Sequence, residues 1–274
     1  MHSPKSSRRY SHSLSGREAT ILTNLSFDGK SIFTTEDLPS SLGISGRQNL
    51  LKALVRKGWV LKVRKGVYAL VPMEAGDRGA EGFAVDRLVV ASSLVEPYYI
   101  GYWSALNYHG LTDQIPAAVY VATTKPRASR QVMGYPIKFV TLPSRKFFGS
   151  EDVEVGKAAV RMSTVEKTIV DCLDHPEHCG GVDTVASALF FNQADINIKT
   201  LVTLARKIGN SAVLKRLGFL AEVLGIGDLA KAIARAELKS GYSPLDPSIP
   251  RRGKFVEKWK IIANVPMNAE QWMR

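Results

Sequence analysis

Three side chains of the kinds that form hydrolase triads, Ser104, His109 and Asp113, lie within one short stretch of the sequence. If residues 102–109 form a helix, at about 100° per residue the serine and the histidine point roughly 140° apart. They cannot face each other, and no G-x-S-x-G motif surrounds the serine. The stretch therefore predicts a core helix with a histidine near its end, and only a triad assembled from distant segments stays open.

A second group, made of Cys172, His175, His178 and Cys179, contains the ligand types of a tetrahedral zinc site. The spacing is cramped because Pro176 interrupts the segment, whereas structural zinc sites usually combine two separated pairs of ligands. We therefore expect solvated histidines at a helix end, a buried Cys172 and no metal. The two cysteines are the only ones in the chain, so a disulfide framework is not expected.

Acidic residues also gather at Glu151, Asp152 and Glu154, with Lys157 nearby, as in some nuclease sites. The pattern lacks the separate upstream aspartate at the end of a strand that would complete such a site. The sequence contains no phosphate-binding P-loop, no dinucleotide-binding fingerprint and no kinase signature. We therefore expect that the protein is not an enzyme and binds no cofactor.

The net charge of +12 is concentrated at the start of the chain. Residues 1–71 contain 12 Lys and Arg against 4 Asp and Glu, a net +8, whereas the remaining 203 residues contain 25 against 21, a net +4. A basic excess of this kind attracts nucleic acid or an anionic membrane surface. No apolar run approaches the roughly 18 residues of a spanning helix, and the N-terminus lacks the apolar core of a signal peptide. We expect a cytoplasmic protein without a membrane partner.

The elements that must position any DNA-binding side chains lie within residues 15–70. Ser15 and Glu18 form a capping box, in which each side chain accepts from a free backbone N–H at the start of a helix. A second, short helix is expected within residues 34–43. Because a proline beyond the first turn removes a backbone hydrogen bond, Pro39 should delay or distort that helix.

A third helix is expected to begin at another capping box, formed by Ser45 and Gln48, and to end at Gly58. One of its faces is apolar and the other carries basic and amide side chains. Two short strands follow, joined by a tight hairpin turn at Lys65 and Gly66. Three short helices and a basic hairpin are the pattern of a winged helix-turn-helix, which places a helix in the major groove of DNA.

The candidate DNA-binding residues lie on the third helix and at the tip of the hairpin. Arg47, Gln48 and Asn49 are expected in the first turn of the helix, where Arg can read guanine and amides can read adenine. Basic residues further along would contact phosphates, and the hairpin tip would meet the backbone or the minor groove. An ordinary solvated basic face, or a winged fold that serves protein contacts, stays open as an alternative. The full set is Ser45, Arg47, Gln48, Asn49, Lys52, Arg56, Arg64 and Lys65.

The rest of the sequence predicts a larger mixed α/β domain with a helical C-terminal section, which makes the fold class α+β. A capping box at Ser163 and Glu166 predicts one helix, and helices with apolar stripes continue from Asp183 to a final apolar strand. Earlier elements are expected as a helix at 83–95 and strands at 117–122, 137–142 and within 153–162. The expected parts are a disordered basic tail at 1–13, the DNA-binding domain at 14–71, a linker at 72–82 and a C-terminal domain at 83–274.

Several blocks of the sequence resemble one known family. They include VRKGVYAL, WSALNYHGLTDQIPAAVYVATT, STVEKTIVDCLDHPEHCGG, RLGFLAEVLG and GYSPLDPSIPRRGKFVEKWKIIANVP. From about Ser15 to Pro266 the chain resembles the AbiEi family of antitoxins and transcriptional regulators, from type IV, abortive-infection toxin–antitoxin systems of phage defence. The resemblance implies a winged helix-turn-helix that binds inverted repeats in its own promoter and represses the operon. It also implies a C-terminal domain that neutralises a nucleotidyltransferase-like toxin, without requiring a stable complex with it.

For toxin neutralisation the sequence itself offers only a basic C-terminal surface, which could equally extend the DNA contact or be a solvated face. An alternative function is a C-terminal enzyme acting on the toxin or on nucleic acid, with the winged helix as its targeting module. Another is a plain transcriptional regulator without a toxin partner. The basic residues of this surface are Lys199, Arg206, Lys207, Lys215, Arg216, Lys231, Arg235, Lys239, Arg251, Arg252 and Lys254.

Overall fold

The computed structural model of the protein describes residues 13–72, 83–235, 238–266 and 272. The expected tail and the expected linker therefore lie almost entirely outside the described residues. Contacts divide the chain into two compact units. The first comprises residues 1–94, 131–135 and 154–160, and the second comprises 95–130, 136–153 and 161–274.

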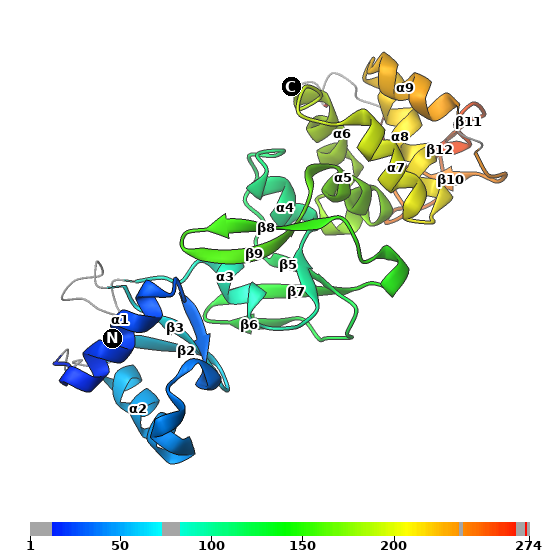
Figure 1. The fold of residues 1–274 in the computed structure, drawn as a ribbon. Helices are drawn as coiled ribbons and strands as arrows, with labels where there is room; N and C mark the ends of the chain where they lie inside the picture. The colour runs from blue at the N-terminus through cyan, green and yellow to red at the C-terminus, as the bar shows by residue number, and fades with distance from the viewer. Residues whose placement is uncertain (1–12, 73–82, 236–237, 267–271, 273–274) are drawn as a thin grey trace, which may run out of the picture. The chain divides into compact units, whose positions relative to one another are not determined.

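The N-terminal part of the first unit consists of two helices and a three-stranded antiparallel sheet (Figure 1). The predicted capping box of α1 is confirmed. Ser15 Oγ accepts from the Glu18 amide at 3.3 Å, and the Glu18 carboxylate accepts from the Ser15 amide at 2.7 Å. The sheet has the order β1-β3-β2. The elements are α1 (Gly16–Phe27), β1 (Ile32–Thr34), α2 (Gly43–Lys57), β2 (Val60–Arg64) and β3 (Val67–Leu70).

The second predicted helix does not form as an α-helix. Its segment instead contains two 3-10 turns, Thr35–Asp37 and Ser40–Leu42. Pro39 lies between them at the N-cap of the second turn, where its ring fixes φ at −50° and leaves no amide hydrogen to donate. Leu38 is buried with only 2% of its surface exposed, so the segment is anchored to the core although it is not a regular helix.

The larger part of the chain is organised on a six-stranded mixed sheet with the order β6-β7-β5-β4-β9-β8 (Figure 1). Strand β4 is antiparallel to β5 and parallel to β9, and β5 is parallel to β7. The predicted strands are confirmed, and the segment 153–162 contributes to two of them. The strands are β4 (Tyr98–Ile100), β5 (Val119–Thr123), β6 (Arg130–Val132), β7 (Tyr135–Thr141), β8 (Ser150–Val155) and β9 (Ala158–Ser163).

Two short helices flank strand β4 in the sequence. The helix predicted at 83–95 is present but confined to α3 (Arg87–Ser92), because Asp86 caps it by accepting from the Leu88 amide at 2.7 Å. Helix α4 (Tyr102–Tyr108) lies between β4 and β5 in the sequence. His109 is the residue at its C-terminal cap, which confirms the predicted histidine near a helix end.

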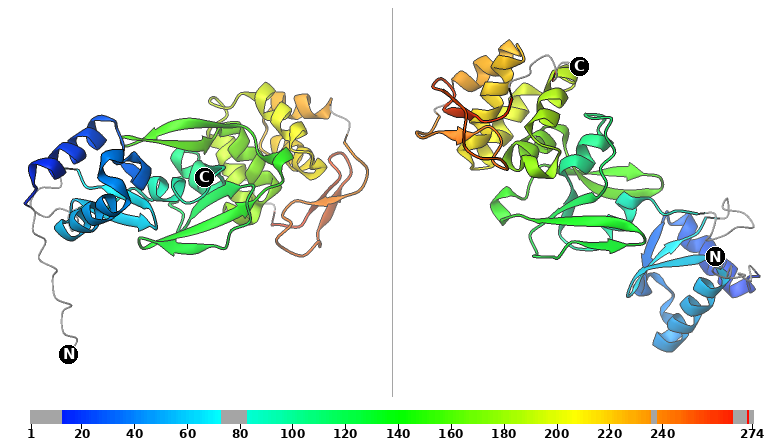
Figure 2. Two further views of the ribbon diagram at one scale, coloured as in Figure 1. Left: turned by 60° about the horizontal axis from the view of Figure 1, so that its bottom comes forward. Right: turned by 180° about the vertical axis from the view of Figure 1, so that it is seen from behind.

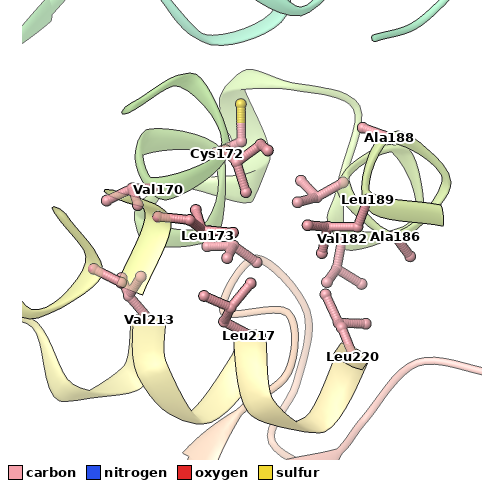
Figure 3. Packing of buried hydrophobic residues seen from close by; sticks show 14 of the residues in the cluster. Val170, Cys172, Leu173, Val182, Ala186, Ala188, Leu189, Val213, Leu217 and Leu220 are labelled. Carbon is pink, nitrogen blue, oxygen red and sulfur yellow. The ribbon is translucent and has the colours of Figure 1, made fainter. Parts of the chain in front are cut away.

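Helices α5 to α9 follow the sheet in sequence and gather at one end of it (Figure 1, Figure 2). Figure 3 shows how Leu173, Val182, Leu217 and Leu220 from three of these helices pack together. None of the described helices combines the length and the apolar character that crossing a membrane requires. The helices are α5 (Val165–Asp174), α6 (Val182–Phe191), α7 (Ile198–Lys207), α8 (Ser211–Val223) and α9 (Gly227–Ala234).

The cap predicted for α5 is wrong by one residue. Thr164 is the N-cap, and its side chain accepts from the Lys167 amide at 3.3 Å. Ser163 cannot take this role because it is still part of β9, where its hydroxyl lies 2.6 Å from that of Thr168.

The chain ends in a small three-stranded sheet, although only one strand was expected from the sequence. Its strands are β10 (Ser243–Pro244), β11 (Lys254–Val256) and β12 (Ile261–Ala263), in the order β10-β12-β11. Between β11 and β12, Trp259 is 1% exposed and packs against Gly218 of α8. A Cβ atom added to Gly218 would lie 2.2 Å from the indole ring, so this contact requires glycine.

Two members of the predicted basic C-terminal surface, Lys215 and Arg216, are buried in the interior of the unit. Lys215 Nζ donates to the Gly241 carbonyl at 2.6 Å. The Arg216 guanidinium donates to the carbonyls of Leu173 and Pro244, at 2.5 and 3.1 Å. Their inclusion in the surface was wrong, because backbone acceptors from segments distant in the sequence surround them, and a helical charge pattern cannot reveal such partners.

Candidate nucleic-acid interface

The polar face of α2 is a narrow stripe of exposed side chains. Taking Ser45 as the origin and about 100° per residue, the other members fall within roughly 60° of it on either side. The buried Leu51 and Leu54 point away from the stripe into the core of the unit. The stripe, called the α2 polar stripe below, consists of Ser45, Gln48, Asn49, Lys52 and Arg56.

The start of α2 differs from the prediction. The helix begins at Gly43 with Leu42 as its N-cap, and no side chain caps it, so the capping box at Ser45 and Gln48 does not form. Gly43 has a φ of +63°, a left-handed conformation that glycine adopts at little cost. This glycine ends the preceding 3-10 turn and leads directly into α2, so that Ser45 already lies inside the first turn.

Arg47 is separated from the α2 polar stripe. Two residues after Ser45, it points roughly 160° away from that residue around the helix. Its Nε donates to the Pro39 carbonyl at 3.1 Å, so its side chain is held against the 3-10 segment. Since α2 begins at Gly43, Arg47, Gln48 and Asn49 all lie in the second turn of the helix, whereas they had been expected in the first turn.

The hairpin of β2 and β3 has the predicted turn. Arg64 pairs with Val67 across the Lys65 and Gly66 loop, and Gly66 has a left-handed φ of +79°. The register shifts between Lys62 and Arg64, a bulge that redirects the strand just before the tip. Arg64 Nε donates to the Ser93 carbonyl at 3.0 Å, so within the first unit this side chain already has an acceptor.

A groove of about 1020 Å³ lies between α2 and the hairpin. Its polar lining includes Gln48 of the α2 polar stripe and Thr35 of the 3-10 segment. The lining of the groove contains no carboxylate. It contains four exposed cations, called the groove cations below: Lys52, Arg56, Lys62 and Lys65. Lys62 was absent from the predicted site, although its position two residues before Arg64 on the same strand was a usable signal.

The groove cations form no ion pair with any residue that the structure describes, whereas Lys30 and Lys57 of the same unit each have a carboxylate partner. Lys57, on the opposite side of α2, forms a 2.6 Å salt bridge with Glu18. Burial acts to raise the pKa of Glu18, but hydrogen bonds from Lys57 and Ser15 outweigh it and hold the pKa below its usual range. Positive charge is therefore neutralised on the inner side of α2 and left available on the groove side.

The structure does not bring the suspected triad together. Ser104 is buried, and its hydroxyl accepts from the Tyr120 amide at 3.0 Å, which fastens α4 to β5. His109 Nε2 lies 2.7 Å from the Ser163 carbonyl oxygen, while Asp113 is exposed. The serine and histidine thus join elements of the fold, and no two members of the suspected triad contact each other.

The residues suspected of forming a zinc site or a nuclease site do not come together as those sites would require. Cys172 and Cys179 are fully buried, and the Cys179 thiol lies 3.2 Å from the Pro176 carbonyl. The two histidines are grouped with Glu177 and not with the thiols. In the acidic stretch, Asp152 accepts two hydrogen bonds from the Arg161 guanidinium, at 2.8 and 2.9 Å, which is an exposed cross-strand pair.

One buried polar group was not foreseen from the sequence. Lys167 of α5 donates to Asp171 one turn later and to the Tyr99 hydroxyl of β4 at 3.0 Å. The Tyr99 hydroxyl donates to the second Asp171 oxygen at 2.8 Å, which closes the group. Burial is the main cause that raises the pKa of Tyr99 and of Asp171. Because all three side chains have partners and no exposed surface, the group joins β4 to α5 rather than forming a reactive site.

Comparison with known proteins agrees with the family expected from the sequence. Residues 21–71, from within α1 to the end of β3, match the family model described as "Transcriptional regulator, AbiEi antitoxin". Among solved structures, the chain is similar to the RV2827C protein from Mycobacterium tuberculosis, with a TM-score of 0.65 and 15% identity, covering 96% of this chain and 95% of that chain. At this identity the likeness shows a shared fold. No curated protein matches the chain.

Proposed function

We propose that the protein is a DNA-binding transcriptional autorepressor that also acts as the antitoxin of a nucleotidyltransferase-like toxin. The observation that carries the DNA-binding half is the groove between α2 and the hairpin, where the groove cations have no ion-pair partner among the described residues. Such unpaired positive charge next to an exposed helix fits the phosphate backbone of a duplex. The family match at residues 21–71 supports a transcriptional regulator of the AbiEi type.

In this proposal the described elements between residues 14 and 71 form a winged helix-turn-helix. Helix α2 enters the major groove, and the second helix of the motif is reduced to the two 3-10 turns. Ser45, Gln48 and Asn49 face base edges, while Lys52 and Arg56 contact phosphates.

The hairpin acts as the wing, and its tip at Arg64 and Lys65 meets the backbone or the minor groove. Arg64 then exchanges its hydrogen bond with Ser93 for a contact with DNA. Arg47 likewise joins the interface only by exchanging its hydrogen bond with the Pro39 carbonyl. The operator is an inverted repeat in the protein's own promoter, bound in the cytoplasm by two copies of the chain.

Sequence discrimination tests the assignment of α2. Gln48→Ala and Asn49→Ala should each weaken binding to the chain's own upstream region by about 5- to 150-fold, because a good base contact contributes about 1–3 kcal/mol. Binding to a scrambled duplex should change little. The matched control is Asn24→Ala, which removes an exposed amide from α1. Fluorescence anisotropy with both duplexes measures the ratio, and an unchanged ratio in the two α2 variants would refute the assignment.

The antitoxin half of the proposal places toxin neutralisation in residues 83–274, joined to the DNA-binding domain by the linker at 72–82. It rests on the family match, since the likeness to the solved structure concerns the fold alone. In cells that express the adjacent reading frame, the full chain should restore growth. A chain with Gln48→Ala and Lys52→Ala should lose repression of a promoter reporter and still restore growth. Loss of both effects at equal protein level would contradict separate roles for the two domains.

A further inference from the structure

A compact group of metal-binding side chains lies on the 3-10 turn that follows α5. His175, Glu177 and His178 each offer one ligand atom, and these atoms all lie within 4.8 Å of one another. The turn comprises Pro176–His178, and His175 is its N-cap. The three donors therefore come from four consecutive residues. The group belongs entirely to the second unit and is separate from the proposed DNA interface.

His175 is oriented by carboxylates on both sides of its ring. Its Nδ1 lies 3.0 Å from Glu177 Oε1, and its Nε2 lies 3.6 Å from Asp174 Oδ2. In metal sites, a histidine that binds the ion through one nitrogen commonly directs the other nitrogen to a carboxylate, which fixes the ring and raises its basicity. With Nδ1 as the ligand atom next to Glu177, His175 comes close to this arrangement, although its Nε2 is farther from Asp174 than a hydrogen bond reaches.

Asp174 is well suited to the supporting role. Its carboxylate accepts from Asn210 at 2.6 Å and from Lys146 at 2.5 Å, and its side chain is only 2% exposed. These two hydrogen bonds fix the carboxylate in position beside His175.

His178 is half-buried, and two aromatic rings hold its imidazole in place. Its ring lies edge-on to Tyr102, with 5.2 Å between ring centroids, and 5.8 Å from the ring of Tyr120. Lys138, whose Nζ donates to the Tyr120 hydroxyl at 3.3 Å, is the nearby cation that disfavours a bound metal ion.

Tyr102 provides an independent sign that the surroundings of His178 are incomplete. The Tyr102 side chain is fully buried, yet its hydroxyl has no hydrogen-bond partner among the described residues. Buried hydroxyl groups in folded proteins nearly always have a partner, so an unpartnered one requires an explanation. If His175 and Glu177 only form a hydrogen bond with each other, their own contact is explained, but the Tyr102 hydroxyl still has no partner among the described residues.

We propose that His175, Glu177 and His178 bind one divalent transition-metal ion of the zinc class. Two imidazoles and one carboxylate suit zinc, cobalt or nickel, whereas magnesium and calcium prefer oxygen ligands alone. Three protein ligands leave a coordination position open, which a water molecule can fill. The buried thiols of Cys172 and Cys179 take no part, so this site differs from the four-ligand arrangement considered from the sequence.

Cobalt titration of the full chain, stripped of metal and free of an affinity tag, tests the proposal. One cobalt ion per chain should bind and produce visible absorption, and zinc should displace it. His178→Ala and Glu177→Gln should abolish the absorption, and Asp174→Asn should weaken affinity by about 10- to 100-fold, as expected for a supporting carboxylate. The matched control is His109→Ala, which removes a histidine that binds the Ser163 carbonyl instead.

Thermal unfolding separates metal binding from a folding defect. Zinc should raise the melting temperature of the wild-type chain and of His109→Ala, and should leave that of folded His178→Ala unchanged. Less than one ion per chain, or equal affinity in wild type and His178→Ala, would overturn the site. In the first case His175 and Glu177 would be joined by a simple hydrogen bond, and in the second the ion would be bound elsewhere.

Discussion

The salt dependence of DNA binding is the sharpest consequence of the groove cations. Each phosphate that a protein cation neutralises contributes about 0.9 to the slope of log affinity against log salt concentration. If all four groove cations contact phosphates, they contribute about −3.6 to the slope for one chain on a half-site duplex, and a phosphate contact of Arg64 would add to this. Over a fourfold rise in salt, from about 50 to about 200 mM, this contribution alone weakens binding by about 150-fold. With Lys62→Ala and Lys65→Ala combined, the contribution falls to about −1.8 and the loss to about 12-fold.

Anisotropy titrations at four or more salt concentrations measure this slope directly. Arg17→Ala is the matched control, because Arg17 is an exposed cation of the same unit that does not line the groove. It should keep the wild-type slope. A wild-type slope in the double variant would refute the contact between the hairpin and phosphates. An equal reduction in Arg17→Ala would show that overall charge, and not the groove, determines binding.

Two further predictions concern stability. Gly218→Ala should lower the free energy of unfolding by about 1–3 kcal/mol, because its Cβ would overlap Trp259. Gly227→Ala, which has open space around it, should be nearly neutral, and urea denaturation compares the two. Asp174 has a lowered pKa in the folded chain, so its contribution to stability is present above the pKa of the unfolded state and is lost as pH falls through the folded value. Asn210→Ala should therefore destabilise the metal-free chain near pH 7 and flatten the acid side of its stability profile, and an unaltered profile would contradict the role of this hydrogen bond.

Local signals in the sequence predicted the beginning and the end of the DNA-binding region. The capping box of Ser15 and Glu18 forms as expected, because both partners lie within one helical turn. The hairpin turn at Lys65 and Gly66 also forms, because only glycine adopts the required φ easily. These features depend on neighbours a few residues apart, which a sequence pattern can specify.

Features set by distant partners could not be predicted in the same way. The pattern at Ser45 satisfies a capping box, yet the helix begins at the left-handed Gly43, so its N-cap lies three residues earlier, at Leu42. Arg47 was predicted to read a base, but the 3-10 segment brings the Pro39 carbonyl close enough to accept a hydrogen bond from its Nε. Lys215 was predicted as a surface charge, because nothing near it in the sequence shows that its Nζ donates a hydrogen bond to the Gly241 carbonyl.

The small C-terminal sheet has a consequence for how functions are mapped by deletion. Its loop and strands supply the carbonyls that accept from Lys215 and Arg216, and Trp259 closes the face of α8 at Gly218. A fragment that ends near residue 240 loses the acceptor of Lys215 and one of the two acceptors of Arg216, and it uncovers the face of α8 that Trp259 packs against. Such a fragment should be less stable than the full chain, so a function missing from it would not locate that function on the surface. The shortest informative fragment of the second unit therefore extends through β12, and shorter ones report on folding alone.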